Sequence, residues 1–461
     1  MLTHSQVEDI FKRVKKHASV DEVEVIVSGG RSALTRFANN AIHQNVAEEG
    51  VAISIRTAID GKTARATTNK LDEESLRRAA QAAEQLTRVQ RPDPDLLPMA
   101  SKSPAIEAKP PSRYFKGTAN VTPEDRAAGV GKIVEVAKKN KLVTAGIYST
   151  SETFEAIVNS QGVSAYHPQT FAEVSITMLA DDSSGWQKAN SPDFQKLDPA
   201  KLAEGAAQKA AGSKHPQELP PGKYTVVLEP AAVLDLVGFM FWDFGAQSVL
   251  DERSFLSKRI GTKLFGDEIT IYDDAYHPLQ AGVQFDGEGV PRKRVTLVEN
   301  GVIKNLVYSR RTAEMMKVSA LGKEISGIQP TGHGFPLPNE MGDAPMNIVF
   351  EGPSSGKAKT VDEMIAGTDR GILVTRCWYI REVEPYEKML TGMTRDGTFL
   401  IENGKVGSGL LNFRFNQSLV EMLRNVLAMS TPVRASGEEA FDMVVPAMKV
   451  RDFNFTEVTK F

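Results

Sequence analysis

The sequence predicts an α+β fold in three parts: an N-terminal α/β domain over residues 1–100, a linker and small central α/β domain over 101–215, and a β-rich C-terminal domain over 216–461. In the first two parts, hydrophobic residues recur alternately at helical and at strand-like spacing. In the last part, apolar runs are joined by Asn-Gly turns, which indicates antiparallel hairpins. The C-terminal part therefore does not fit a doubly wound nucleotide-binding sheet, whose strands are parallel.

Two helices and several strands are expected in the N-terminal domain. Apolar residues recur at helical spacing over residues 5–17, which predicts an amphipathic helix. Asp72 is placed to cap a second helix that runs to Gln90. The Asp60-Gly61 pair supplies a tight turn between the last two strands. The expected strands are 22–27, 32–38, 51–58 and 62–68.

The central part follows a proline-rich segment. Six prolines lie between residues 91 and 115, and because proline removes a backbone donor, this segment is expected to be a linker or an extended arm. Thr122-Pro123 predicts the start of a helix that ends near Lys139. The further elements expected here are strands over 142–149 and 164–180 and an alanine-rich helix near 199–211.

Two hairpins are predicted in the C-terminal domain. The run 294–298 leads through Asn300-Gly301 into Val302-Ile303, and the run 398–401 leads into Asn403-Gly404. Asn and Gly adopt the positive φ angles that a two-residue hairpin turn requires. The strands on either side of each turn are therefore expected to pair in antiparallel fashion.

Charge and cysteine content exclude several functional classes. Lys and Arg number 55 against 58 Asp and Glu, so a net charge of −3 leaves no global positive field to hold a nucleic acid. Cys377 is the single cysteine, which excludes an internal disulfide and a multi-thiolate zinc site. The most apolar stretch, 231–244, is too short to span a bilayer, and the N-terminus has no signal-peptide core. We expect a cytoplasmic protein without membrane contact.

Three local motifs imitate catalytic sites. His333 lies between two glycines, but no histidine is followed by Glu and no two lie within five residues of each other, so a loop histidine that packs or hydrogen-bonds is the favoured interpretation. The stretch 352–356 matches the nucleophile motif G-x-S-x-G, yet no histidine follows it in the chain. As a phosphate-binding loop it has one residue too few between its glycines, so a turn is favoured. Cys377 is interpreted as a buried structural cysteine because its setting is strand-like.

Several short stretches, taken in order, point to one family. In the N-terminal domain they are Arg36-Phe37-Ala38-Asn39-Asn40, Ile55-Arg56, Asp60-Gly61 and Thr68-Asn69. In the C-terminal domain they are 285–289, 297–304, Thr331-Gly332-His333 and 399–406. With these stretches the sequence resembles the TldD/PmbA family, which is peptidase U62-like and historically called modulators of DNA gyrase.

The resemblance implies a zinc peptidase assembly built from two related subunits. In the TldD type, a helix carries His-Glu-x-x-x-His and a cysteine near the C-terminus completes the zinc site, whereas the TldE or PmbA type has a similar fold without these ligands. The alignment places Gly238, Phe239 and Asp243 where His, Glu and His would stand. Glycine offers no ligand and phenylalanine cannot act as a base, so these positions are degenerate. Residues 430–435 carry no cysteine either, and the chain therefore resembles the metal-free subunit.

The resemblance thus implies a non-catalytic subunit of a TldD/TldE-type zinc metallopeptidase that degrades or processes unfolded peptides. The expected partner is a TldD-type subunit that holds the zinc, in a heterodimer; no cofactor is expected in this chain, and a homodimer in isolation stays open. An unfolded peptide can be held as an added strand through main-chain hydrogen bonds. The candidates for peptide binding or for a structural role are Asn39, Asn40, Thr331, Gly332 and His333.

Two alternatives remain open at this point. One is an autonomous metallopeptidase with unusual ligands, built from His333 and scattered carboxylates, which stoichiometric zinc in the isolated chain would favour. The other is a protein-binding regulator of the gyrase-modulator type. At a net charge of −3, such a regulator would contact protein rather than DNA.

Overall fold

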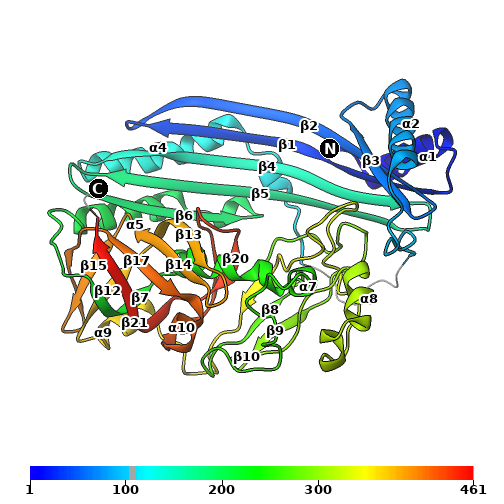
Figure 1. Cartoon of the computed structure of the whole chain (residues 1–461). Helices are drawn as coiled ribbons and strands as arrows, with labels where there is room; N and C mark the ends of the chain where they lie inside the picture. The colour runs from blue at the N-terminus through cyan, green and yellow to red at the C-terminus, as the bar shows by residue number, and fades with distance from the viewer. Residues whose placement is uncertain (103–110, 460–461) are drawn as a thin grey trace.

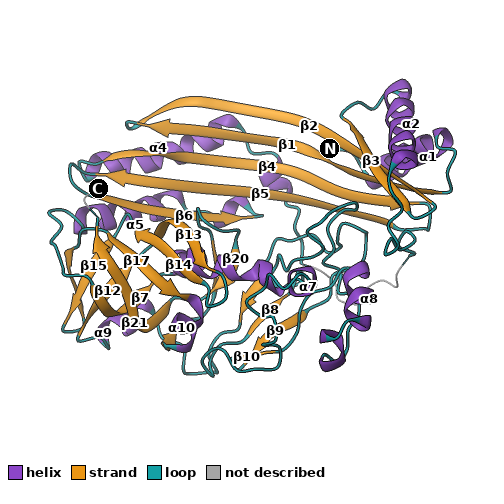
Figure 2. Cartoon of the chain, viewed as in Figure 1, coloured by secondary structure: helices purple, strands orange, loops and turns teal. Residues whose placement is uncertain are grey.

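The computed structural model describes residues 1–102 and 111–459. A long antiparallel sheet lies across a β-rich C-terminal domain, as Figures 1 and 2 show. Helices and strands are segregated in this way, and the predicted α+β class is confirmed. Within the described residues, no helix is long and apolar enough to cross a membrane.

The first sheet combines residues of the N-terminal and central parts. Its order is β3-β2-β1-β4-β5-β6, and every neighbouring pair is antiparallel. Because β1 pairs with both β2 and β4, the two parts share one continuous sheet. The strands are β1 (Glu22–Ala38), β2 (Ala41–Ile59), β3 (Lys62–Thr68), β4 (Val143–Asn159), β5 (Ser164–Leu179) and β6 (Ser184–Ser191).

Three of these strands are longer than the sequence predicts. The expected strands 22–27 and 32–38 form the single strand β1, which runs through Gly29-Gly30. A Cβ atom at Gly30 would lie 2.0 Å from the Glu152 carbonyl oxygen on β4, so glycine here permits close strand pairing and does not mark a break. The first half of β2 is mostly exposed and lacks apolar alternation, which is why the prediction began only at residue 51. β4 likewise continues past residue 149, to Asn159.

Helices cover one face of this sheet at both of its ends (Figure 2). α1 (His4–His17) and α2 (Glu73–Val89) pack with Val25 of β1 at one end. α4 (Pro123–Lys139) and α5 (Pro199–Gly212) pack with Phe37 and the β5 core at the other. All four predicted helices are therefore confirmed. Since side chains alternate along a strand, the even-numbered β1 residues face the opposite way, toward the C-terminal domain.

The C-terminal domain contains two further sheets. The larger has the order β13-β14-β17-β21-β7-β12-β15-β16, with β18 paired to β21, and the smaller has the order β10-β9-β8-β11-β20-β19. Only the pairs β7–β12 and β11–β20 are parallel among the described strands. The strands are β7 (Gly222–Leu228), β8 (Ile271–Asp273), β9 (Val295–Glu299), β10 (Val302–Ile303), β11 (Ile348–Phe350), β12 (Arg370–Val374), β13 (Cys377–Glu384), β14 (Met389–Thr394), β15 (Thr398–Glu402), β16 (Lys405–Gly409), β17 (Phe413–Ser418), β18 (Val426–Met429), β19 (Val433–Ala435), β20 (Met443–Val445) and β21 (Met448–Val458).

Short helices fill the spaces around these sheets. The main hydrophobic core surrounds α6, whose residues from Ala232 to Val237 are buried. The helices outside the first sheet's two pairs are α3 (Lys116–Ala119), α6 (Pro230–Val237), α7 (Ala246–Leu250), α8 (Arg310–Val318), α9 (Val361–Ala366) and α10 (Leu419–Arg424), with 3-10 turns η1 (Phe194–Lys196), η2 (Gly238–Phe244) and η3 (Leu321–Glu324).

Both predicted Asn-Gly hairpins are confirmed. The β9–β10 turn holds Asn300 at φ 49° and Gly301 at φ 77°. The β15–β16 turn holds Asn403 at φ 50° and Gly404 at φ 73°. Two consecutive positive φ angles are the signature of the type I′ turn, which suits the twist of the flanking strands.

A buried ionic network joins the sheet to the C-terminal domain. Glu24 of β1 accepts hydrogen bonds from Arg56 Nε at 3.1 Å and Arg56 NH2 at 2.9 Å, and it also accepts one from Arg65. Arg65 in turn donates to the carbonyl oxygen of Leu337 in the C-terminal domain. Glu24 and Arg56 are almost completely buried, so this network lies inside the junction.

The proline-rich segment also contacts the C-terminal domain. Arg113, which is buried, donates to the carbonyl oxygens of Ala275 at 3.2 Å and His277 at 3.0 Å. The prediction of a linker or extended arm covers residues 103–110 as well, which lie outside the described residues.

Candidate functional site

Gly238 and Phe239 lie at the end of α6, where the resemblance places the first His and the Glu of the zinc motif. α6 ends at Val237, and the chain continues as the 3-10 turn η2. A Cβ atom at Gly238 would lie 2.2 Å from Cβ of Ala440, so the space that a ligand side chain needs is already filled. Phe239 is partly buried and packs against the hydrophobic core. Neither residue can hold a metal.

Asp243 stands at the position of the motif's second His, and its carboxylate is paired with a lysine of the same chain. Its Oδ2 atom lies 2.6 Å from Nζ of Lys388, and its Oδ1 atom accepts the Phe255 N–H at 3.0 Å. Lys388 also pairs with Glu382, and both Asp243 and Lys388 are buried. Burial raises the pKa of Asp243, while the Lys388 ammonium works in the opposite direction. Both carboxylate oxygens are therefore engaged by the chain itself.

Asp235, one turn before Gly238, ties the helix to two other segments. Its carboxylate accepts the N–H groups of Cys377, Glu438 and Glu439, each at 3.3 Å. Burial raises the pKa of Asp235 to about 7. Asp235 therefore acts as an anchor for the loop before β20, because three backbone donors converge on it.

The single cysteine is structural. Cys377 begins β13 and is fully buried, and burial raises the pKa of its thiol far above the ordinary value. A thiol that stays protonated is a poor nucleophile and a poor metal ligand. The predicted buried setting of Cys377 is confirmed. Across residues 1–102 and 111–459, no group of three or more His, Cys, Asp or Glu side chains is arranged to hold a metal ion, and the residues present at the α6 end do not fit zinc.

Asn39 and Asn40 form the turn between β1 and β2. Their φ angles are 50° and 61°, as a tight hairpin turn requires. The Asn40 side chain donates to the Leu142 carbonyl at 3.0 Å and accepts the Thr144 N–H at 2.8 Å, so it fixes the start of β4. The structure thus gives Asn40 a structural contact, far in the chain from the C-terminal candidates.

Thr331, Gly332 and His333 form a buried loop in the C-terminal domain. His333 Nε2 lies 2.9 Å from Asp273 Oδ1, and His333 Nδ1 lies 2.9 Å from the Thr331 hydroxyl. Gly332 has φ 75°, and a Cβ atom there would lie 2.3 Å from the Pro291 carbonyl oxygen. His333 is only 1% exposed, so a bound peptide cannot reach it in this conformation.

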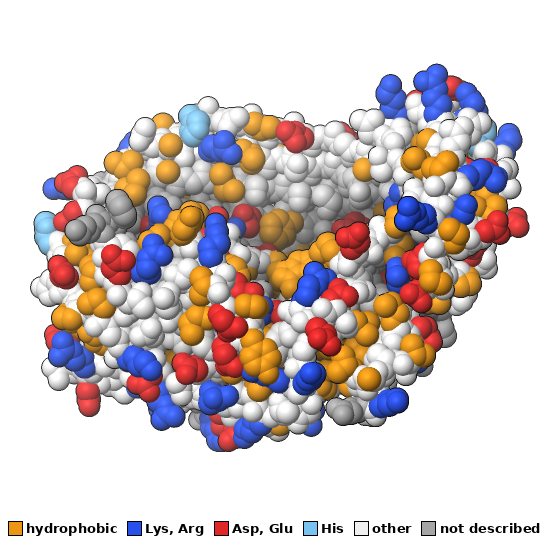
Figure 3. All heavy atoms as spheres, viewed as in Figure 1, with side chains coloured by type: hydrophobic (Ala, Val, Ile, Leu, Met, Phe, Trp, Pro, Cys, Tyr) orange, Lys and Arg blue, Asp and Glu red, His pale blue; other side chains and the backbone are white. Residues whose placement is uncertain are grey.

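A groove separates the sheet from the C-terminal domain, and Figure 3 shows the surface hollowed between them. Its roof is the even-numbered face of β1 with the residues paired to it on β2 and β4. Two cavities open along this roof, of about 250 Å³ around Leu34 and about 360 Å³ around Ile26. These two β1 residues are eight positions apart, which corresponds to about 26 Å of strand.

The degenerate helix end borders this groove. Trp242 of η2 is 44% exposed and stacks on Phe335 with ring centroids 5.9 Å apart. Phe335 in turn lines the larger cavity, together with Phe285, Pro336 and Met346. An apolar floor therefore leads from η2 into the groove.

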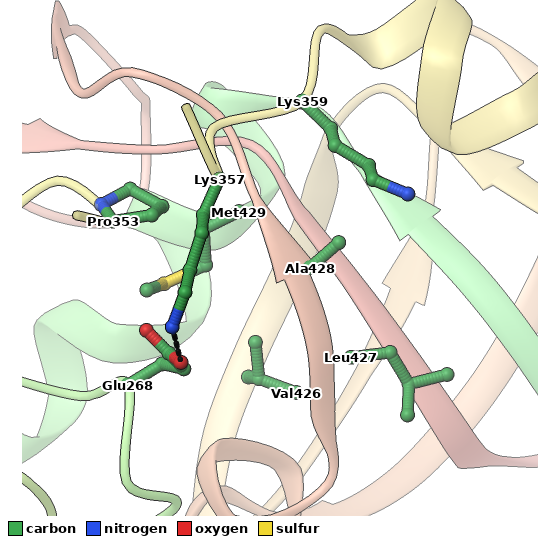
Figure 4. A pocket seen from close by; sticks show the side chains of 8 residues that line it. All are labelled: Glu268, Pro353, Lys357, Lys359, Val426, Leu427, Ala428 and Met429. Carbon is green, nitrogen blue, oxygen red and sulfur yellow. Dashed lines mark ion pairs between the residues drawn. The ribbon is translucent and has the colours of Figure 1, made fainter. Parts of the chain in front are cut away.

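The G-x-S-x-G stretch lies elsewhere, beside a small cavity of about 150 Å³ next to β18 (Figure 4). Lys357 points toward Glu268 with Nζ 3.5 Å from Oε1, whereas Lys359 points away from that pair. Both partners of the ion pair are more than half exposed. The stretch is a surface turn, as the sequence favoured, and no histidine lines the cavity.

Three family models match the chain in order. The PmbA/TldA metallopeptidase domain 1 matches residues 23–87, the central domain matches 118–214, and the C-terminal domain matches 221–457. The C-terminal match alone covers more than half of the chain. The chain belongs to the PmbA/TldD family.

Relatives of this PmbA/TldD chain are distant in sequence but close in fold. An uncharacterized protein of Methanocaldococcus jannaschii is 26% identical over 286 residues, which is 60% of this chain and 64% of that protein, so the match spans slightly under two thirds of that relative. Metalloprotease PmbA of Escherichia coli O157:H7 is 20% identical over 445 residues, 93% of this chain and 91% of PmbA. The crystal structure of TldE from Thermococcus kodakarensis has a TM-score of 0.85 at 20% identity and covers 98% of this chain and 100% of that one. The PmbA/TldD chain therefore shares the TldE fold.

Sequence reasoning missed two residues of this region. Lys388 lies 145 positions after Asp243 in the chain and has no motif of its own, so nothing in the sequence indicated their contact. Asp235 is an acidic residue within the apolar stretch 231–244. A buried acidic residue on an apolar helix needs partners, and that rule is a signal that could have found Asp235.

Proposed function

We propose that this chain is a non-catalytic, TldE/PmbA-like subunit of a zinc metallopeptidase complex that degrades or processes unfolded peptides. The ion pair between Asp243 and Lys388 carries the proposal, because a lysine ammonium neutralises the one acidic side chain at the degenerate motif. Ala440 supports it by filling the space beside Gly238. In this proposal the zinc and the catalytic groups belong to a TldD-type partner.

The sheet supports a role in holding an unfolded peptide. β3 pairs only with residues 53–59 of β2, so residues 41–52 have no neighbour strand on their outer edge within the described part of the chain. A free edge accepts an extended chain through main-chain hydrogen bonds, which do not depend on side-chain identity. This edge and the adjoining groove would guide an unstructured segment toward the partner's zinc site.

Co-expression with a TldD-type subunit tests the proposal. We expect the two chains to coelute in size-exclusion chromatography and to cleave an unstructured reporter peptide faster than the partner does alone. The matched control is the same complex in which the glutamate of the partner's His-Glu-x-x-x-His motif is replaced by glutamine. The control should coelute and lack cleavage. Separate elution with no gain in cleavage would contradict the proposal.

Zinc content separates this proposal from an autonomous metallopeptidase. Structural and catalytic zinc sites use three or four protein ligands, and the α6 end offers one carboxylate that is already paired. The proposal also places the complex in the cytoplasm, which suits a chain with a single, buried cysteine.

A further inference from the structure

The larger cavity of the groove contains two charged side chains without close partners. Its lining includes three charged residues, Glu155 from β4 and Asp286 and Arg292 from the C-terminal domain. Asp286 is satisfied, because its carboxylate accepts the N–H groups of Glu288, Val290 and Gly334 at 2.8–2.9 Å. The side chain of Glu155 makes no hydrogen bond or ion pair with any described residue. Glu155 and Arg292 therefore line the same cavity without forming a hydrogen bond to each other.

Arg292 lines this cavity, and two of its guanidinium nitrogens lack hydrogen-bond partners. Its Nε and NH1 atoms are buried and have no hydrogen-bond partner in the described structure. A buried guanidinium nitrogen without an acceptor loses hydration and gains nothing in return, so such donors are rare unless a ligand or water completes them. An acceptor group such as a carboxylate would satisfy them, and a guanidinium binds a carboxylate with two parallel bonds.

Glu155 is the complementary group on the opposite wall. It remains open to the groove, yet surrounding protein raises the pKa of its carboxyl, and Arg292 partly offsets this effect. An ammonium group is the natural partner of an unpaired carboxylate in such a place. The same cavity is also lined by apolar side chains, among them Ile26, Ile157 and Met346.

We propose that this cavity binds a short peptide with free termini, whose carboxylate meets Arg292 and whose ammonium meets Glu155. A zwitterion satisfies both side chains without changing the net charge of the cavity, and its side chains fill the apolar walls. The volume of about 360 Å³ lies in the usual range for small-ligand sites and suits a dipeptide or tripeptide. This site would capture short peptide products or chain ends, and that role rests on the proposed function.

Calorimetric titration of the full chain alone, with capped and uncapped dipeptides, tests the site. The probes are Leu-Phe, N-acetyl-Leu-Phe and Leu-Phe-amide. We expect each cap to weaken binding about tenfold or more, because each removes one charge-assisted contact. Glu155→Gln should abolish the effect of acetylation and keep the effect of amidation, and Arg292→Gln should do the reverse. The matched control is Glu48→Gln, which removes the same charge from the smaller cavity on the same sheet face and should bind like the wild type.

Three results would overturn the inference. They are equal affinity for capped and free dipeptides, no binding of Leu-Phe at about 10 mM, or a loss in Glu48→Gln as large as in Glu155→Gln. A variant that loses one cap preference and keeps the other is folded, so its fold is checked within the same titration. The titration needs no partner subunit, so the two proposals fail separately. Failure to form a heterodimer would refute the proposed function and leave this site standing. Equal binding of capped and free dipeptides would refute the site and leave the proposed function standing.

Discussion

Replacing Glu24 with glutamine tests the ionic network that joins the sheet to the C-terminal domain. Glu24 is fully buried and is held by Arg56 at 2.9 and 3.1 Å and by Arg65. Burial alone would raise the pKa of Glu24, but the two guanidinium groups outweigh it and hold that pKa below its ordinary value. The ionised carboxylate therefore stabilises the folded chain.

Glutamine keeps the shape of Glu24 and removes its charge. Arg56, which is 1% exposed, and Arg65 would then remain buried without their shared counter-charge. Removing one partner of a buried ion pair costs about 3–5 kcal/mol. This is a large part of the roughly 5–15 kcal/mol that stabilises a typical domain. We expect Glu24→Gln to lower the free energy of unfolding by about 3–5 kcal/mol.

Urea denaturation followed by circular dichroism measures this loss. Glu74→Gln is the matched control, since Glu74 also binds two arginines, Arg77 and Arg78, but lies half exposed on α2. Water screens that cluster, so the control should change stability little. A carboxyl with a depressed pKa contributes stability above its unfolded pKa and loses it as the pH falls. The gap between wild type and Glu24→Gln should therefore shrink below about pH 4.

A loss in Glu24→Gln no larger than that in Glu74→Gln would refute this reasoning. So would a gap that stays constant or widens in acid, because the stabilisation would then not come from the ionised carboxylate.

Three further changes probe other parts of the molecule. Lys388→Met leaves Asp243 buried and unpaired and should lower the unfolding free energy by about 3–5 kcal/mol in urea, while adding Asp243→Asn should restore part of the loss; no loss in the single variant would contradict the pairing. Burial raises the pKa of Asp343 to about 6, so the folded chain holds this proton more tightly than the unfolded chain and stability falls as pH rises from about 4 to 6. Asp343→Asn should flatten that part of the stability curve, and an unchanged slope would exclude the assignment. Asn40→Ala should lower the free energy of unfolding by about 2 kcal/mol more than Asn39→Ala in thermal or urea unfolding. Both variants replace an asparagine that has a positive φ, but only Asn40 holds the start of β4 with two hydrogen bonds. Equal losses would show that those bonds contribute nothing.

Local signals in the sequence predicted most of the fold. Helix α4 begins at Pro123, as the capping residues indicated, and the Asn300-Gly301 hairpin formed because its two residues accept positive φ. The errors arose where tertiary context decides. Gly29-Gly30 looked like a break but lies within β1, since the sheet needs a close approach to β4 at that point.

The candidate site was less accessible to sequence reasoning. The degenerate residues Gly238 and Asp243 were recognised by resemblance, but the contacts that define their roles, Ala440 and Lys388, come from distant segments. The groove is formed by a sheet face and loops of another domain, and its charged residue Glu155 sits in an unremarkable strand pattern. Such non-local juxtapositions leave no periodicity or motif in the chain.

Zinc analysis of the isolated chain is the most direct test of the central claim that this subunit does not carry the catalytic metal. The chain should be purified without chelator from zinc-supplemented cells and measured by mass spectrometry of the metal. We predict a zinc content near zero, because Gly238 and Phe239 offer no ligand and Asp243 is paired with Lys388. About one zinc per chain, retained through gel filtration, would contradict the account.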